Sequence, residues 1–358
     1  MKNYVPFLKT KVNEFSAIKN LEPDIKKDIT PFFDINRKAE KKVSPTQQTT
    51  SFSNYSESEY KELIRKLVNK FKLNANELSC FYLDDYDIDN NLYIDGKQSY
   101  GFVLKQFSSF LFIPVIGIDR SFERNEIVFS NKDIIQSDTV AIRIVNDDLQ
   151  TGVFDFKKLT EISKKYFNKI EVVIDLKILS TDSKISDIFN RITKFLQKAG
   201  DFSRVIITGS SIPKSIGEAV SVKEVKDIVR KELELFNMLN QSFSNIVYGD
   251  YTIVSPYYSD VDMPPKMLLN ITAAKVIYSY DRYHHVYRGE TLKSGNYQQF
   301  KDFCEDISQQ YFFRGIAYSC GDEFIANARN MARNITQSSI LAPTINAHIS
   351  YMYKDYQL

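Results

Sequence analysis

Charged and small polar residues stand at the ends of several short β-branched segments, where they could take part in chemistry. Asp34, Arg143, Asp175 and Asp250 each lie in or directly after such a segment, and Gly209-Ser210-Ser211 ends another. Carboxylates act as general bases or bind hard cations, and an arginine fork binds carboxylate or phosphate groups. If the segments are parallel strands of one sheet, their ends meet at one edge, which predicts a polar site there.

Alternation along two of these segments predicts an ion pair. In TVAIRIV (139–145) the isoleucines on either side of Arg143 share one face, so Arg143 points to the other face. In EVVIDL (171–176) Asp175 shares a face with Val173. If the two strands are neighbours, Arg143 and Asp175 meet inside the sheet. Two interpretations stay open, namely a buried structural ion pair and a clamp for an anion or substrate.

The ends of two further segments could each have either a structural or a ligand-binding role. The backbone N–H groups of Gly209, Ser210 and Ser211 could bind an anion, although the sequence lacks a P-loop and a simple turn is the other interpretation. In VYGDYT (247–252) Asp250 and Tyr251 follow Gly249, so Asp250 could be a base, a metal ligand or a loop cap.

The histidine content limits the metals that the site could use. The three histidines are His284, His285 and His348, which disfavours a multi-histidine zinc site. A metal, if used, should be Mg²⁺ held by Asp34, Asp175 or Asp250; the cofactor is otherwise unassigned.

Strand-like segments alternate with amphipathic stretches, which is typical of a parallel sheet built from βα units. We expect eight barrel strands at 29–35, 81–88, 112–118, 139–145, 171–176, 204–211, 245–252 and 274–281. The predicted fold is α/β, a single (β/α)₈ TIM-barrel-like domain with an N-terminal extension and C-terminal helices. An open doubly wound α/β sheet is the alternative. A barrel would place the strand ends at one mouth.

The expected domain is one unit over residues 1–358. The polar segment 38–56 is predicted to be a mobile loop, and 297–358 a C-terminal helical extension. We expect one long helix over 222–241 and a loop at 284–290.

Composition bounds the remaining possibilities. A formal net charge of +2 argues against nonspecific electrostatic binding of nucleic acid by the whole surface, although binding by a local basic patch is still possible. No apolar run is long enough to span a bilayer, and the three cysteines show no CxxC spacing, so we expect a cytoplasmic protein that does not contact a membrane.

Motifs along the chain resemble the beta protein family of phages and of mobile or defence-associated bacterial loci. The motifs, in order, are YVPFLKTKVNEFSAIKNL, ITPFFDI, GSSIP, VRKEL, VYGDYT, VYRGE and AYSCGDEFI. The family-like positions are Lys9, Glu14, Arg230, Glu232, Gly249, Asp250, Tyr251, Arg288, Gly289, Glu290, Gly321 and Asp322. No established catalytic assignment comes with them.

The resemblance implies a component of a bacterial antiphage defence or phage-conflict system, with a protein partner encoded nearby that could be nuclease-like. We expect the barrel mouth to bind a phosphorylated or nucleotide-like ligand and to allow its hydrolysis. Asp175 and Asp250 are the expected catalytic residues. The expected ligand-binding residues are Asp34, Arg143, Ser210, Ser211, Arg230, Glu232, Tyr251, Arg288, Glu290 and Asp322. The alternative is a non-enzymatic sensor or adaptor that binds a partner protein or phage product.

Overall fold

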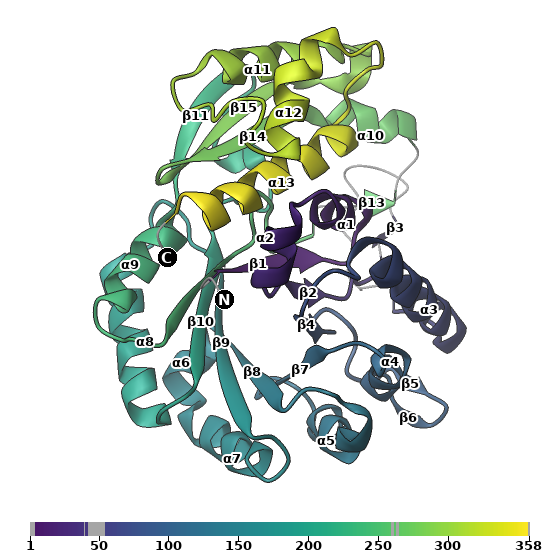
Figure 1. Cartoon of the computed structure of the whole chain (residues 1–358), viewed down its shortest axis with the longest axis vertical. Coiled ribbons are helices and arrows are strands. Elements are labelled where there is room, and N and C mark those ends of the chain that lie inside the picture. Colours follow the sequence, from purple (N-terminus) through teal and green to yellow (C-terminus); the bar gives the residue numbers. More distant parts are fainter. Residues whose placement is uncertain (1–3, 39, 42–53, 259–260, 263–264, 357–358) are drawn as a thin grey trace.

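Eight parallel strands close into a barrel in the computed structural model, which describes residues 4–38, 40–41, 54–258, 261–262 and 265–356 (Figure 1). The order around the barrel is β1-β12-β10-β9-β8-β7-β4-β2. The bounds are β1 Tyr4–Lys9, β2 Phe32–Asp34, β4 Phe81–Asp84, β7 Phe112–Gly117, β8 Thr139–Val145, β9 Lys169–Ile178, β10 Arg204–Ser210 and β12 Ile246–Asp250. The predicted (β/α)₈-like fold is confirmed.

One expected barrel strand lies outside the barrel, and one barrel strand was not expected. The first strand is β1, which pairs with both β2 and β12 and thereby closes the barrel, so it is not an extension outside it. The segment 274–281 does not close the barrel, because it lies in β14 (Ala273–Tyr280) of a separate sheet. Both segments are short, apolar and β-branched, so local pattern does not distinguish them.

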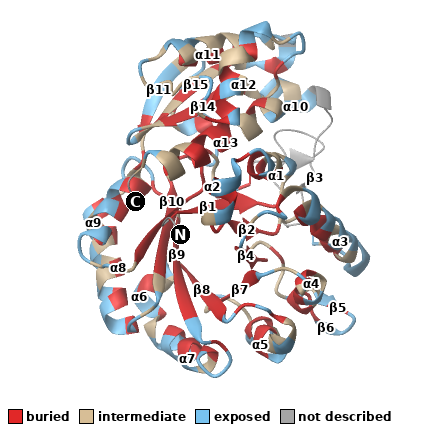
Figure 2. Cartoon of the chain, viewed as in Figure 1, coloured by how far each residue is buried: buried red, intermediate tan, exposed pale blue. Residues whose placement is uncertain are grey.

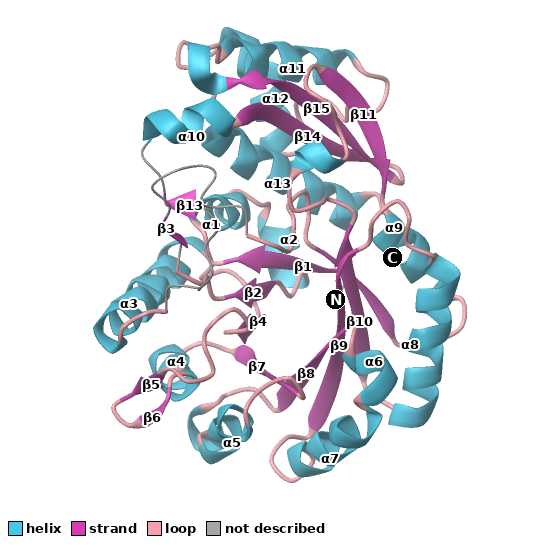
Figure 3. Cartoon of the chain, turned by 180° about the vertical axis from the view of Figure 1, so that it is seen from behind, coloured by secondary structure: helices cyan, strands magenta, loops and turns pink. Residues whose placement is uncertain are grey.

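A three-stranded antiparallel sheet lies beside the barrel, in the order β11-β15-β14 (Figure 3). β11 covers Glu224–Val229 and β15 covers Tyr283–Thr291. The expected helix over 222–241 is therefore a strand followed by α9 (Lys231–Asn240), and the expected loop at 284–290 is a strand. Pairing of β11 with β15 overrides the helical propensity of the Lys- and Glu-rich start of the segment 222–241.

Helices cover the outside of the barrel and expose their polar faces (Figure 2). α3 begins after a capping box formed by Ser56 and Glu59, and it buries an apolar stripe that includes Ile64 and Phe71. The bounds of the barrel helices are α1 Val12–Lys19, α2 Pro23–Asp28, α3 Glu57–Asn74, α4 Tyr100–Phe107, α5 Phe122–Ser130, α6 Asp148–Thr151, α7 Val153–Ser163 and α8 Ile185–Ala199. The small pairs are β3 (Glu40–Lys41) with β13 (Val261–Asp262), and β5 (Tyr93–Ile94) with β6 (Lys97–Gln98).

The C-terminal part is helical and returns to the barrel. α11 (Gln298–Gln309) and α12 (Cys320–Asn327) pack on the small sheet, and α13 (Gln337–Lys354) lies between that sheet and the barrel (Figure 1). α10 (Pro265–Ile271) precedes β14. Most of the segment 38–56, expected to be a mobile loop, lies outside the described residues.

Candidate functional site

Four charged side chains project from strand ends into the upper barrel. The interior below them is apolar and includes Phe32, Tyr82, Ala141 and Val173, each two residues before one of the charged positions. Asp34, Asp84, Arg143 and Asp175 therefore face inward by strand alternation. All four are at most 3% exposed.

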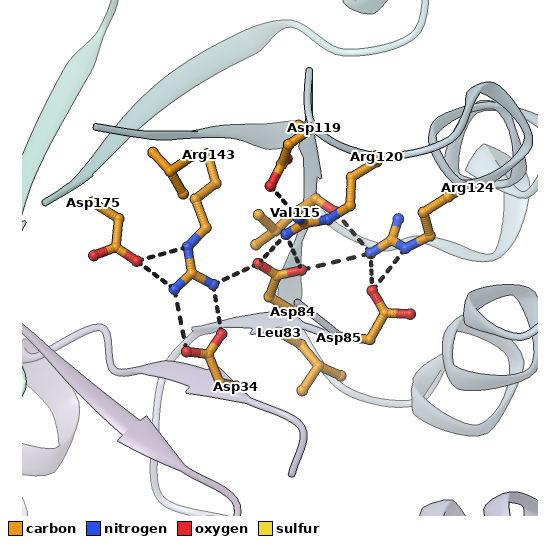
Figure 4. A network of polar contacts seen from close by, with 12 residues as sticks. Asp34, Leu83, Asp84, Asp85, Val115, Asp119, Arg120, Arg124, Arg143 and Asp175 are labelled. Carbon is orange, nitrogen blue, oxygen red and sulfur yellow. Dashed lines mark hydrogen bonds and ion pairs between the residues drawn. The ribbon is translucent and has the colours of Figure 1, made fainter. Parts of the chain in front are cut away.

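Arg143 is the centre of this group (Figure 4). Its Nη1 lies 2.6 Å from Asp34 Oδ1 and 2.8 Å from Asp84 Oδ2. Its Nη2 lies 2.6 Å from Asp175 Oδ2, and its Nε lies 3.1 Å from the same oxygen. The predicted pair of Arg143 with Asp175 is thus present, extended by two carboxylates.

The guanidinium of Arg143 has no N–H left for an additional ligand. Besides the contacts above, Nη2 lies 3.3 Å from Asp34 Oδ2 and 3.1 Å from the hydroxyl of Tyr251. A guanidinium carries five N–H donors, and all are engaged. Of the two interpretations of Arg143 and Asp175, the geometry favours the buried structural ion pair over the anion clamp.

A second layer of cations balances the carboxylates. Arg120 Nη2 lies 3.0 Å from Asp84 Oδ2, and Lys177 Nζ lies 2.9 Å from Asp175 Oδ2. The ring of Tyr86 contacts these cations, with Lys177 Nζ 3.8 Å and the Arg120 guanidinium carbon 4.6 Å from its centroid. Tyr86 is half-buried and separates the network from a cavity described below.

Two of the three carboxylates bound by Arg143, Asp34 and Asp175, differ in protonation behaviour. Burial raises the pKa of Asp34 despite the nearby charge of Arg143. Burial also acts on Asp175, but the charges of Lys177 and Arg143 outweigh it and lower the pKa of Asp175. Asp34 is consequently the member of the network closest to accepting a proton.

Asp175 in β9 and Asp250 at the end of β12 hold the backbone that follows them in the same way. Each accepts a backbone N–H from the residue two positions later, Lys177 at 2.9 Å and Thr252 at 2.9 Å. Lys177 and Thr252 both have a φ of 56°, which is a strained value for a β-branched residue such as Thr252. The two Asp side chains therefore hold a left-handed backbone position two residues after them, inside β9 at Lys177 and just after β12 at Thr252.

Asp250 nevertheless points away from the barrel axis. Its neighbours Val247 and Tyr251 face the barrel interior, so alternation directs Asp250 to the outer side. There it accepts hydrogen bonds from Tyr4 (2.9 Å) and Tyr248 (3.0 Å), and its Oδ2 lies 3.0 Å from Arg230 Nη2. The expected meeting of Asp34, Asp175 and Asp250 at one point does not occur.

A buried hydrogen-bonded chain continues from Asp250 to the small sheet. His348 Nε2 lies 2.9 Å from Asp250 Oδ2, and His348 Nδ1 lies 2.7 Å from Ser279 Oγ. Ser279 Oγ in turn lies 2.9 Å from His284 Nδ1. Since the Asp250 carboxylate only accepts, His348 donates from Nε2 and Ser279 donates to His348. Burial lowers the pKa of His348 to about 4, so this histidine is neutral at pH 7.

The Gly209–Ser211 turn uses its side chains internally. Ser210 Oγ donates to the carbonyl of Val254 at 3.2 Å, and Ser211 Oγ donates to Glu232 at 2.5 Å. Arg230 precedes α9 and Glu232 lies in its first turn, so the two residues do not both lie inside one long helix as expected. Arg230 Nε and Glu232 Oε1 lie 3.7 Å apart, and both side chains are buried.

Three expected ligand-binding residues lie on the small sheet and its helices instead of the mouth. Arg288 donates to the carbonyl of Val220 at 2.6 Å, and Glu290 pairs with Lys223 at 2.6 Å. Asp322 lies in the first turn of α12, where its backbone N–H donates to the N-cap residue Ser319 and its carboxylate accepts a hydrogen bond from Tyr278. These residues join the sheet, its preceding loop and α12, and they do not contact Arg143.

Sequence reasoning missed several members of both networks. Asp84 could have been found, because it ends a strand as Asp34 does. His284 and His348 gave no usable signal, since they are 64 positions apart (348 − 284) and only the fold brings them to the same Ser279 hydroxyl. Within the described ranges, no group of three or more His, Cys, Asp or Glu is placed to hold a metal ion.

A cavity of about 510 Å³ opens beside the network at the carboxyl ends of β2 and β4. Its lining includes Arg37 and Lys38 after β2, Tyr55 before α3, and Tyr86 and Asp87 after β4. This is the end of a (β/α)₈ barrel at which barrel proteins bind ligands.

Fold and site together define a (β/α)₈-barrel protein whose mouth is closed at its centre by buried ion pairs and hollowed at one side. The chain belongs to the Beta protein family, whose model matches residues 4–354. Neither a curated protein nor a solved structure gives a match. None of the helices in the described ranges has the length and hydropathy required to cross a membrane.

Proposed function

We propose that this protein is a ligand-binding component of a bacterial antiphage defence or phage-conflict system, and that its ligand is phosphorylated or nucleotide-like. The observation that carries the ligand class is the chemistry of the mouth cavity. Arg37 and Lys38 supply positive charge for phosphate, and Tyr55 and Tyr86 supply aromatic surface for a base. The phage-conflict setting rests on the family resemblance.

The remaining lining of the cavity suits the same ligand. Asp87 and Asp89 are carboxylates that can accept hydrogen bonds from ribose hydroxyls, and Asn54 donates to Asp89 at 2.5 Å. A cavity of about 510 Å³ lies within the size range of small-molecule sites.

The saturated ion network favours binding over hydrolysis. Arg143 has no free donor, and Asp175 Oδ2 is occupied by Arg143, Lys177 and Tyr251. A general base needs a free lone pair directed at its proton. Catalysis by Asp175 or Asp250 stays a prediction, and hydrolysis would require the network to rearrange.

Thermal unfolding with a panel of nucleotides, with and without Mg²⁺, tests the proposal. Ligand at a hundredfold excess over Kd stabilises the folded state by about 2.7 kcal/mol, which gives a measurable rise in Tm. Lys38→Met should abolish the rise. Lys61→Met is the matched control, because Lys61 is similarly accessible and also pairs with a glutamate of α3, but does not line the cavity.

No shift with any nucleotide, or equal shifts in both variants, would refute binding at this cavity. Copurification with the protein encoded beside it, together with no nucleotide shift, would support the second candidate, a non-enzymatic sensor or adaptor. The saturated network is the observation that favours this candidate, because it leaves the mouth charges with a structural role.

A further inference from the structure

A second cavity, of about 210 Å³, lies where the barrel rim, the small sheet and α13 meet. The barrel contributes the end of β1 and the segments that follow β10 and β12. The small sheet contributes β14, and α13 closes the remaining side. None of its lining residues lines the mouth cavity.

The charged lining of this second cavity is strongly unbalanced. Four lysines line it, namely Lys9, Lys11, Lys214 and Lys275, against one carboxylate, Glu14. Lys9 is only 5% exposed, and its Nζ lies 3.8 Å from the ring centroid of Tyr258, on which Lys11 also lies at 5.0 Å. The ring of Tyr258, which does not itself line the cavity, thus brings the two ammonium groups together, and the guanidinium carbon of Arg37 lies 4.9 Å from the same ring centroid.

Lys275 supplies an ammonium group without a counter-charge. It lies on β14 next to Val276, and its backbone N–H and carbonyl are bound by Gln337 of α13 at 3.0 and 3.2 Å. Across the part of the chain that the structure describes, no carboxylate lies within ion-pair distance of its Nζ. Burial lowers its pKa, and no nearby negative charge counteracts this. Lys275 is partly buried, and a partly desolvated cation without a counter-charge is stabilised by an anion.

The remaining lining is apolar, with Ile212, Ile253, Ile277 and Leu341 among its residues. An engineered apolar cavity of about 150 Å³ holds benzene, so a cavity of about 210 Å³ holds a slightly larger apolar ligand. Lysine binds phosphate as a point charge, and several ammonium groups match a dianion.

We propose that this cavity is a second binding site, distinct from the mouth cavity, for a small phosphate monoester with a compact apolar group. The phosphate lies among the lysine ammonium groups, and the apolar group contacts the isoleucine and leucine side chains. Because Lys9 and Lys11 belong to the barrel and Lys275 belongs to the small sheet, the bound anion joins these two parts of the molecule.

Titration calorimetry of the full chain with phenyl phosphate tests the proposal. We expect saturable binding that weakens as salt is raised, and a loss of affinity of about tenfold or more in Lys275→Met. Lys165→Met is the control, because Lys165 is exposed just after α7, outside the cavity, and should leave the affinity unchanged. Lys275→Met should also raise the Tm of the ligand-free protein, since it removes an uncompensated, partly buried charge.

Equal affinity in Lys275→Met and the native chain would overturn the proposal, as would the absence of saturable binding. Binding that Lys38→Met abolishes and Lys275→Met leaves intact would assign phenyl phosphate to the mouth cavity, and would also overturn it. Binding that Lys275→Met weakens and Lys38→Met leaves intact would support this site whether or not nucleotides bind at the mouth.

Discussion

Replacing Arg143 by Met tests whether the mouth network is structural. Methionine keeps the apolar stem and removes the charge. Asp84 then retains Arg120 at 3.0 Å, and Asp175 retains Lys177 at 2.9 Å. Asp34 retains no cation within ion-pair distance among the described residues, because Arg143 is its ion-pair partner there. The variant therefore isolates one buried carboxylate, and its effect on stability can be derived from Asp34 alone.

The magnitude follows from protonation of that carboxylate. A buried carboxylate without a partner takes up a proton, and relative to an unfolded pKa of about 3.9 this costs about 4 kcal/mol at pH 7 and about 1.5 kcal/mol at pH 5. The upper value agrees with the roughly 3–5 kcal/mol measured for broken buried ion pairs. The loss of stability in Arg143→Met should therefore shrink by about 2.5 kcal/mol between pH 7 and pH 5.

Urea unfolding followed by circular dichroism at pH 7 and pH 5 measures both values. Adding Asp34→Asn to the variant should recover most of the loss at pH 7, because no buried carboxylate of the network is then without a cation. Arg329→Met is the matched control, since the pair of Arg329 with Asp302 at 2.7 Å is exposed and should contribute at most about 1 kcal/mol. A loss below about 1 kcal/mol in Arg143→Met, or a loss that does not change with pH, would refute the reasoning.

Three further predictions concern the junction of the barrel with the small sheet. The pKa of His348 falls from 6.5 to about 4 on folding, so the contribution of His348 to the free energy of unfolding should be fully present above pH 6.5 and should decrease by about 3 kcal/mol as the pH falls to 4. In urea unfolding, His348→Gln should flatten this pH dependence, and an unchanged slope would contradict the prediction. Asp250→Asn should reduce the free energy of unfolding by about 3–5 kcal/mol, because Arg230 loses its closest counter-charge, and a native Tm would disprove this. Gly321→Ala should lower stability by about 1–3 kcal/mol, since an added Cβ would lie 2.1 Å from the carbonyl oxygen of Pro343 in α13; an unchanged unfolding midpoint would show that α12 and α13 separate freely.

The sequence by itself determined the class of fold and the inward direction of Arg143. Alternation has a period of two residues and needs no distant information, so the Arg143 and Asp175 pair could be predicted from 139–145 and 171–176 alone. The βα alternation likewise indicated a parallel barrel.

Only the tertiary structure decided which segments close the barrel and which face of a fully buried strand is the inner one. In β12, Val247 and Tyr248 are both buried, so the sequence pattern does not show that Asp250 points outward to His348. The same holds for β1 and β14, whose local patterns are alike and whose partners are chosen by closure of the barrel. Strand pairing and the packing of α13 between the barrel and the small sheet depend on contacts between residues far apart in sequence. Local propensity does not contain information about such contacts.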